Sequence, residues 1–181
     1  MTPAEYLKNY AQYFVIAGEY DTIFPSVKIA QAALETGWGK HIVGNNLYGI
    51  KATGNTTPYW NGAYVSANTT EYGNGGYQSQ VSNFRSYPSF SDSIRDHSYL
   101  INTLDRYAGV RAARTPEEQA RALKAAGYAT DPQYAEKLIS IITKYNLKKY
   151  DSKKKIMKYI EIAAAVIGIL FAGWTIYKNL K

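Results

Sequence analysis

The sequence contains no cysteine and only two histidines, His41 and His97, among its 181 residues. The absence of cysteine excludes disulfides, thiolate zinc sites and cysteine nucleophiles. Two histidines are too few for a histidine-rich metal site, so we expect both to be surface or packing residues. We therefore expect no metal and no other cofactor. The first residues also lack a basic segment followed by an apolar one, and no secretory signal peptide is predicted.

Acidic residues are scarce in the last part of the chain. Residues 1–147 carry 13 lysines and arginines against 12 acidic residues, a net charge of +1, whereas residues 148–181 carry 8 against 2, a net charge of +6. The nearly neutral first part gives no indication of nucleic-acid binding. The positive charge belongs to the C-terminal segment, where a lipid membrane is the expected partner.

The composition is that of a globular protein, with 46% hydrophobic and 19% charged residues. Its unusual feature is a total of 18 tyrosines. Tyrosine suits carbohydrate binding, because its ring packs on apolar sugar faces and its hydroxyl bonds to sugar hydroxyls. Tyrosines also populate strands and half-buried faces. Composition alone favours this second explanation.

One stretch, residues 32–39, combines a helix end with an acidic residue. Apolar side chains precede it at helical spacing, at Val27, Ile29, Ala30, Ala33 and Leu34. Ser26 is the expected N-cap, and Gly37 and Gly39 are expected to end the helix. Glu35 then lies in the last turn, where the helix dipole disfavours a carboxylate by roughly 0.3–1 kcal/mol. With Trp38 as an apolar wall, Glu35 would stay protonated, as a general acid must. The alternative is a solvated glutamate at a helix end.

The remaining pattern predicts helices separated by a small hairpin. Helices are expected at about residues 3–18, from residue 89, from Thr115 to about residue 126, and from Asp131 to about residue 145. Asp131 is the expected cap of the last helix, with Thr130 as the alternative. These segments predict a helix-dominant α+β fold.

Short strands are predicted at residues 63–65 and 77–81, on either side of an Asn-Gly turn within residues 72–76. This turn would bring Glu71 near the tip of the hairpin or the end of a strand.

The C-terminal segment differs in character from the rest. Residues 148–155 form a basic linker, residues 156–178 are mostly apolar, and residues 179–181 form a tail. The uncharged run, residues 162–177, is shorter than the roughly 20 residues of a typical span. Charged residues near one end of the longer segment can reach the interface, and its tyrosines and tryptophan suit aromatic belts. We predict one transmembrane helix over residues 156–178, with an interfacial or a packing helix as alternatives.

Five segments resemble, in the same order, motifs of a peptidoglycan hydrolase family. They are residues 32–39, 45–51, 69–72, 84–87 and 127–134. Together they are similar to the glucosaminidase family, glycoside hydrolase family 73, over about residues 10–147. The resemblance implies a lysozyme-like fold with a helical body, a small β-hairpin lobe and a groove between them, in a catalytic domain that we place at residues 1–147.

The resemblance also implies an activity. An endo-β-N-acetylglucosaminidase of this family hydrolyses the β-1,4 bond after N-acetylglucosamine in the glycan strands of peptidoglycan. Glu35 matches the catalytic acid and Glu71 the second acidic position. Whether Glu71 activates water or the acetamido group of the substrate attacks is left open.

Further residues are assigned by the same resemblance. The expected substrate-binding residues are Tyr128, Asn46, Tyr48, Trp60 and Tyr72. Tyr128 matches a tyrosine that lines the groove, and Asn46 and Tyr48 are expected to shape its floor. Trp60 is either a sugar platform or a packed hairpin residue. Arg85 is expected to brace the hairpin through a salt bridge, and Tyr134 to lie in the core.

Three functional hypotheses follow. The first is a membrane-tethered glucosaminidase, the second a muramidase or lytic transglycosylase on the same fold, and the third a wall-binding structural module. Lysines are more numerous before the apolar segment than after it, which favours a cytoplasmic enzyme domain. A bacteriophage enzyme held on a host membrane or an internal virion membrane would reconcile this orientation with wall hydrolysis. A bacterial enzyme inserted the other way is the alternative.

Overall fold

The fold is described by a computed structural model over residues 1–17, 22–73 and 76–152. Its elements are α1 (Pro3–Ala17), α2 (Pro25–Glu35), β1 (Tyr64–Gly73), β2 (Gly76–Arg85), α3 (Phe90–Thr103), the 3₁₀ helix η1 (Asp105–Tyr107), α4 (Ala108–Ala112), α5 (Pro116–Ala125) and α6 (Tyr134–Lys144). Helices dominate and the sheet has two strands. The predicted helix-dominant α+β class is confirmed.

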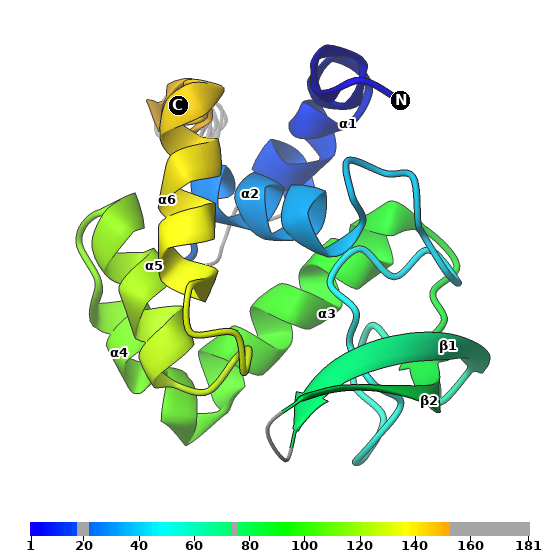
Figure 1. Cartoon of the computed structure of the whole chain (residues 1–181). Helices are drawn as coiled ribbons and strands as arrows, with labels where there is room; N and C mark the ends of the chain where they lie inside the picture. Colours follow the sequence, from blue (N-terminus) through cyan, green and yellow to red (C-terminus); the bar gives the residue numbers. More distant parts are fainter. Residues whose placement is uncertain (18–21, 74–75, 153–181) are drawn as a thin grey trace, which may run out of the picture.

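The helices form a body beside the hairpin. Figure 1 shows α4, α5 and α6 on one side of the molecule and the two-stranded sheet on the other, with α3 running between them. Helix α2 packs against α1, α5 and α6. Residues 25–33 of α2 are all buried, so this helix is the centre of the core. Its C-terminal end emerges from the core, and this is where Glu35 lies.

Local caps begin the helices where the sequence predicts them. In α1, the Thr2 backbone N–H donates to Oε2 of Glu5 at 2.7 Å, and the Glu5 backbone N–H donates to Oγ1 of Thr2 at 3.2 Å. Ser89 caps α3 and Thr115 caps α5 through the same kind of side-chain bond. Each cap satisfies backbone N–H groups that a helix start leaves without partners.

The prediction that Ser26 is the N-cap of α2 is wrong. The helix begins at Pro25, its N-cap is Phe24, and no side chain caps it. Ser26 instead donates through its hydroxyl to Oδ2 of Asp151 at 2.8 Å, and its backbone N–H donates to Oδ1 of the same residue at 2.8 Å. A carboxylate distant in the chain thus replaces the local cap. Because Tyr150 is also buried, the packed body extends beyond residue 147, into the segment predicted to be a linker.

The start of α6 also differs from the prediction. Gln133 is its N-cap, without a side-chain bond, and neither Asp131 nor Thr130 occupies that position. Asp131 accepts the Gln133 backbone N–H at 2.9 Å through Oδ1. This bond stabilises the turn that precedes the helix, as an aspartate commonly does through its own local backbone.

The hairpin is longer than the sequence predicts. Strands β1 and β2 are antiparallel, with Tyr64 opposite Arg85 and Gly73 opposite Gly76. Glu71 pairs with Gln78, so its backbone lies close to the end of β1, as predicted. The hairpin sequence is mostly polar and its apolar residues are sparse, which is why the periodicity predicts only the first part of each strand.

Among the described residues, no helix has the length and apolar character needed to cross a bilayer. The predicted transmembrane segment, residues 156–178, lies outside them.

Candidate active site

Glu35 is the last residue of α2, and the chain turns sharply after it. Thr36 is the C-cap, and both Gly37 (φ 56°) and Trp38 (φ 62°) adopt left-handed backbone conformations. The Trp38 ring packs edge-on against Tyr145, with centroids 4.5 Å apart, and against Tyr6 at 5.7 Å. The tryptophan therefore anchors this turn to α1 and α6, while the group that hydrogen-bonds to Glu35 is Tyr134.

The Glu35 carboxyl lies between α6 and the loop after Gly44. The Tyr134 hydroxyl donates to Oε1 at 3.3 Å, and a Cβ atom added to Gly49 would lie 3.8 Å from Oε2. By surface area Glu35 is exposed, yet desolvation by the surrounding protein raises its pKa to about 7, against a smaller lowering by the Tyr134 hydrogen bond. These two observations agree for a carboxyl that is enclosed by protein and open to water on one side.

Asn46 holds the loop beside Glu35. Its side-chain NH₂ donates to the carbonyls of Ile50 at 2.8 Å and Arg85 at 3.0 Å, and its carbonyl accepts the backbone N–H groups of Tyr48 at 3.2 Å and Ile50 at 3.1 Å. This set uses every hydrogen-bonding position of the amide. The arrangement supports a role in shaping the floor of the groove, and it leaves no amide group for a direct bond to substrate.

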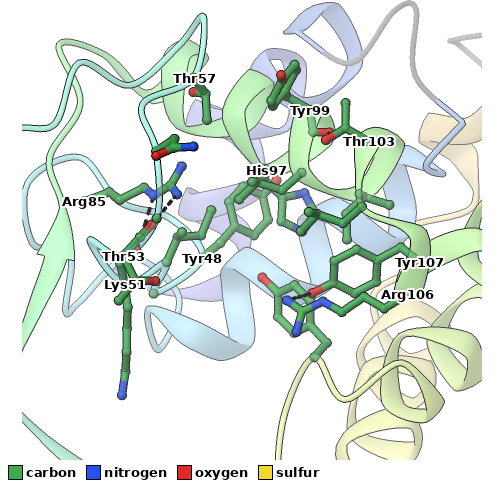
Figure 2. Close-up of a pocket in the computed structure, with 18 of the residues that line it drawn as sticks. Tyr48, Lys51, Thr53, Thr57, Arg85, His97, Tyr99, Thr103, Arg106 and Tyr107 are labelled. Carbon is green, nitrogen blue, oxygen red and sulfur yellow. Dashed lines mark hydrogen bonds between the residues drawn. The ribbon is translucent and has the colours of Figure 1, made fainter.

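A hollow of about 670 Å³ lies beside this loop. It lies between residues 48–57 on one side and the C-terminal part of α3, η1 and residues 127–128 on the other. Figure 2 shows Tyr48 beside His97, with Arg106 and Tyr107 along the same hollow. Tyr48 and His97 stack with ring centroids 3.9 Å apart, so His97 is a packing residue, as expected. Glu35 is not one of the residues that line the hollow, but the lining residue Gly49 lies next to its Oε2 atom.

Tyr128 lines the hollow at the predicted place. Its ring stacks on Tyr134 with centroids 5.7 Å apart and meets His97 edge-on at 5.7 Å. The Tyr128 hydroxyl is buried and has no hydrogen-bond partner among the described residues. Tyr134 is 2% exposed, in agreement with the core position expected for it. The hydrogen bond from Tyr134 to Glu35 was not predicted from the sequence.

Trp60 is packed inside the hairpin lobe. It is 5% exposed, its Nε1–H donates to the Ala63 carbonyl at 2.7 Å, and the Arg85 guanidinium covers its ring at 4.0 Å. Arg85 in turn donates to Oδ2 of Asp96 at 2.8 Å. The brace expected of Arg85 is therefore present, and the position of Trp60 favours the packed-residue alternative over the sugar platform.

The second acidic residue lies on the hairpin. Glu71 and Tyr72 are both in β1, opposite Gln78 and Tyr77 of β2. Their side chains lie outside the described part of the structure. The roles predicted for Glu71 and Tyr72 thus remain predictions from the sequence.

Comparisons with known proteins agree with this geometry. Residues 11–147 match the glucosaminidase family model, described as mannosyl-glycoprotein endo-beta-N-acetylglucosaminidase. The chain belongs to the glucosaminidase family. Its relatives include exo-glucosaminidase LytG of Bacillus subtilis, 36% identical over 80% of this chain and 52% of LytG. Peptidoglycan hydrolase FlgJ of Pseudomonas aeruginosa is 46% identical over 62% of this chain and 29% of FlgJ. The chain thus spans about half or less of these curated relatives.

Solved structures of glucosaminidase-family relatives share the fold. A mutant of the peptidoglycan hydrolase from Sphingomonas sp. A1 superposes with a TM-score of 0.70 at 34% identity, covering 82% of this chain and 97% of the other. The truncated glycoside hydrolase domain of Salmonella typhimurium FlgJ gives a TM-score of 0.63 at 35% identity, covering 80% and 98%. The lysozyme-like architecture implied by the sequence motifs is confirmed by these similarities.

Sequence reasoning missed several residues of this glucosaminidase site. Gln31, Asp96 and Tyr107 were not singled out, yet they contact Tyr134, Arg85 and Tyr128 respectively. Gln31 offered one signal, because it is a polar residue four positions before Glu35 and so lies on the same helix face. Asp96 and Tyr107 come from distant elements and carry no such local signal.

Proposed function

We propose that this protein hydrolyses the β-1,4 bond after N-acetylglucosamine in the glycan strands of peptidoglycan, with Glu35 as the general acid. The observation that carries the proposal is the Glu35 carboxyl itself, which is exposed to water, lies next to Gly49 of the hollow and has its pKa raised to about 7 by desolvation. Such a carboxyl is protonated in a large share of molecules near neutral pH. It is therefore able to protonate a leaving glycosidic oxygen.

Glu71 is proposed as the second acidic group of the reaction. Glycosidic cleavage passes through an oxocarbenium-like transition state. A carboxylate on the face of the sugar opposite the leaving group can stabilise this state, or activate a water molecule that attacks it. The support is the match of Glu71 to the second acidic position of the family, together with the place of its backbone near the end of β1. Attack by the acetamido group of the substrate is the alternative, with Glu71 orienting that group.

Tyr128 is proposed to contact a sugar through its ring. The ring is half-buried and lines the hollow beside Glu35, whereas its hydroxyl faces the interior. An aromatic surface of this kind can pack against the apolar face of a pyranose ring. Tyr48 forms the adjoining floor of the hollow.

The test combines one substitution with product analysis. Glu35→Gln keeps the shape of the side chain and removes the acid, so we expect loss of wall hydrolysis by at least 100-fold with the fold retained. Mass spectrometry of digested peptidoglycan should then find N-acetylglucosamine at the new reducing ends for the unsubstituted protein. Reducing-end muramic acid would indicate a muramidase, and anhydro ends a lytic transglycosylase. Undiminished hydrolysis by Glu35→Gln would overturn the assignment of the acid.

The apolar segment at residues 156–178 is proposed to tether the enzyme to a membrane, in the manner of a bacteriophage lytic or entry enzyme. The support comes from the sequence alone, namely the length of the segment and the lysines before it. Protease protection in vesicles tests the orientation. Digestion of the enzyme domain from the periplasmic side would exclude the cytoplasmic orientation and favour a bacterial enzyme inserted the other way.

A further inference from the structure

Gln31 occupies a position in the core that packing alone does not explain. Its side chain is 0% exposed on α2, one helical turn before Glu35. The Nε2–H donates to the Tyr134 hydroxyl at 3.1 Å, whereas the Oε1 carbonyl has no hydrogen-bond partner among the described residues. A buried carbonyl without a partner costs about 1–3 kcal/mol. An apolar residue of the same size would avoid this cost, so the amide has a use other than packing.

The geometry sets the direction of a hydrogen-bond chain. A tyrosine hydroxyl has one proton to donate, and the NH₂ of Gln31 can only donate. Because the Gln31 N–H occupies a lone pair on the Tyr134 oxygen, the Tyr134 proton is directed to Oε1 of Glu35, 3.3 Å away. Oε1 is then an acceptor. The proton of the Glu35 acid is left on Oε2, the oxygen nearer to Gly49 and the hollow.

We propose that Gln31 is a positioning residue which, through Tyr134, keeps the acid proton of Glu35 on Oε2, the oxygen next to Gly49 at the hollow. The inference rests on the proposed role of Glu35. In the reaction, the O–H bond at Oε2 breaks and an O–H bond forms on the glycosidic oxygen. The electron pair of the C1–O bond leaves with that oxygen. The carboxylate that remains keeps the hydrogen bond from Tyr134, which stabilises its charge.

Titration of Glu35 can be observed without interference from its described neighbours. The titratable side chains described around it are Tyr134 on α6 and Tyr128 in the loop before it, and burial raises the pKa of both well above the ordinary tyrosine value. Both phenols therefore remain protonated while Glu35 titrates.

The proposal is tested by Gln31→Met, which keeps the size of the side chain and removes the donor. The Tyr134 oxygen can then accept a proton from Glu35, so the protonated acid gains a hydrogen bond with its proton on Oε1. We expect kcat to fall about 10-fold with KM unchanged. The alkaline limb of the pH profile should move to higher pH, because the protonated form has become more stable. The melting temperature should stay the same or rise.

A second buried glutamine provides the matched control. Gln119 on α5 is also 0% exposed, but its amide bonds to the Phe24 N–H and to the carbonyls of Thr22 and Val110. Gln119→Met should lower the melting temperature and leave the position of the alkaline limb unchanged. The melting temperature and the position of the alkaline limb thus distinguish the role of Gln31 from that of Gln119.

A double-mutant cycle completes the test. In a Tyr134→Phe background the hydrogen bonds from Gln31 to Tyr134 and from Tyr134 to Glu35 are already absent. Adding Gln31→Met should then not move the alkaline limb further. Wild-type kcat and an unmoved limb in Gln31→Met would overturn the proposal, as would an equal effect in the Phe background. If Gln31→Met lowers kcat by impairing folding, the limb stays in place and the proposal fails. Because Glu35→Gln is measured alongside, failure of this inference remains distinct from failure of the assigned acid.

Discussion

Arg85 and Asp96 form a buried ion pair that joins the hairpin lobe to α3. Arg85 Nη1 lies 2.8 Å from Oδ2 of Asp96, with the two side chains 5% and 0% exposed. The same carboxylate accepts the hydroxyls of Tyr87 at 2.6 Å and Thr57 at 2.5 Å. One aspartate therefore connects β2, the segment after it and the loop that lines the hollow. We expect the position of the lobe relative to the helical body to depend on this pair.

Neutralising Asp96 should destabilise the protein strongly. Asp96→Asn leaves the Arg85 charge buried without its counter-ion, and removing one partner of a buried pair costs about 3–5 kcal/mol. Arg85 also donates to the carbonyls of Thr53 and Lys51. Because these bonds remain in the variant, we expect a loss of unfolding free energy near the lower value. Urea unfolding measures the change.

The exposed pair Lys137–Asp131, whose side chains are 46% and 35% exposed, provides the control. Asp131→Asn should cost less than about 1 kcal/mol, because solvent screens such pairs. Equal losses for Asp96→Asn and Asp131→Asn would show that the buried pair contributes no more to stability than the exposed one.

Hydrolysis should decline as the pH rises through about 7. Glu35 donates a proton in the proposed reaction, and its pKa is raised to about 7 by desolvation. Above this value the fraction of protonated acid falls about tenfold for each pH unit. The measurement is kcat on soluble glycan fragments between pH 5 and 9. A rate that stays constant to pH 9 would contradict the prediction.

Removing the Tyr134 hydroxyl should move the alkaline limb of the pH profile, where hydrolysis declines, to higher pH. The hydrogen bond from Tyr134 lowers the pKa of Glu35, so Tyr134→Phe leaves desolvation unopposed. We expect the alkaline limb to lie at higher pH than in the unsubstituted protein, measured in the same assay. A downward shift would mean that the hydroxyl does not stabilise the carboxylate.

Replacing Glu35 should stabilise the protein at alkaline pH. Its pKa is about 7 in the folded state and near the ordinary 4.5 when unfolded, so the unfolded state releases its proton first as the pH rises. The contribution of this group to stability is complete below pH 4.5 and is lost as the pH rises through 7. Glu35→Gln removes this loss, and its melting temperature should exceed that of the unsubstituted protein at pH 8 but match it at pH 4. A difference that is the same at both pH values would contradict this linkage.

Gly44 should tolerate substitution less than Gly54. Both have left-handed backbone, with φ of 58° and 78°, which costs an alanine about 1–2 kcal/mol. At Gly44 a Cβ would also lie 2.9 Å from Oγ and 3.1 Å from Cα of Ser86, whereas at Gly54 nothing lies within 4 Å. We expect Gly44→Ala to be the more destabilising by about 1–3 kcal/mol in urea unfolding. Equal losses would show that the Ser86 contact relaxes without cost.

Local sequence determined much of the helical body. The caps at Thr2, Ser89 and Thr115 act on backbone groups three residues away, so their positions can be read from the chain itself. The end of α2 at Glu35 likewise follows from the glycines after it, which adopt the left-handed conformation that ends a helix. A helix-terminal carboxyl beside a turn was therefore predictable as a candidate acid.

Tertiary structure decided what surrounds that carboxyl. Asp151 replaced the expected cap at Ser26, Asp96 paired with Arg85, and the Gln31–Tyr134–Glu35 chain joined two helices about 100 residues apart in sequence. The desolvation that raises the pKa of Glu35 depends on these long-range neighbours. Local patterns act through bonds within a few residues, whereas burial and charge pairing depend on which distant segments meet in the folded chain.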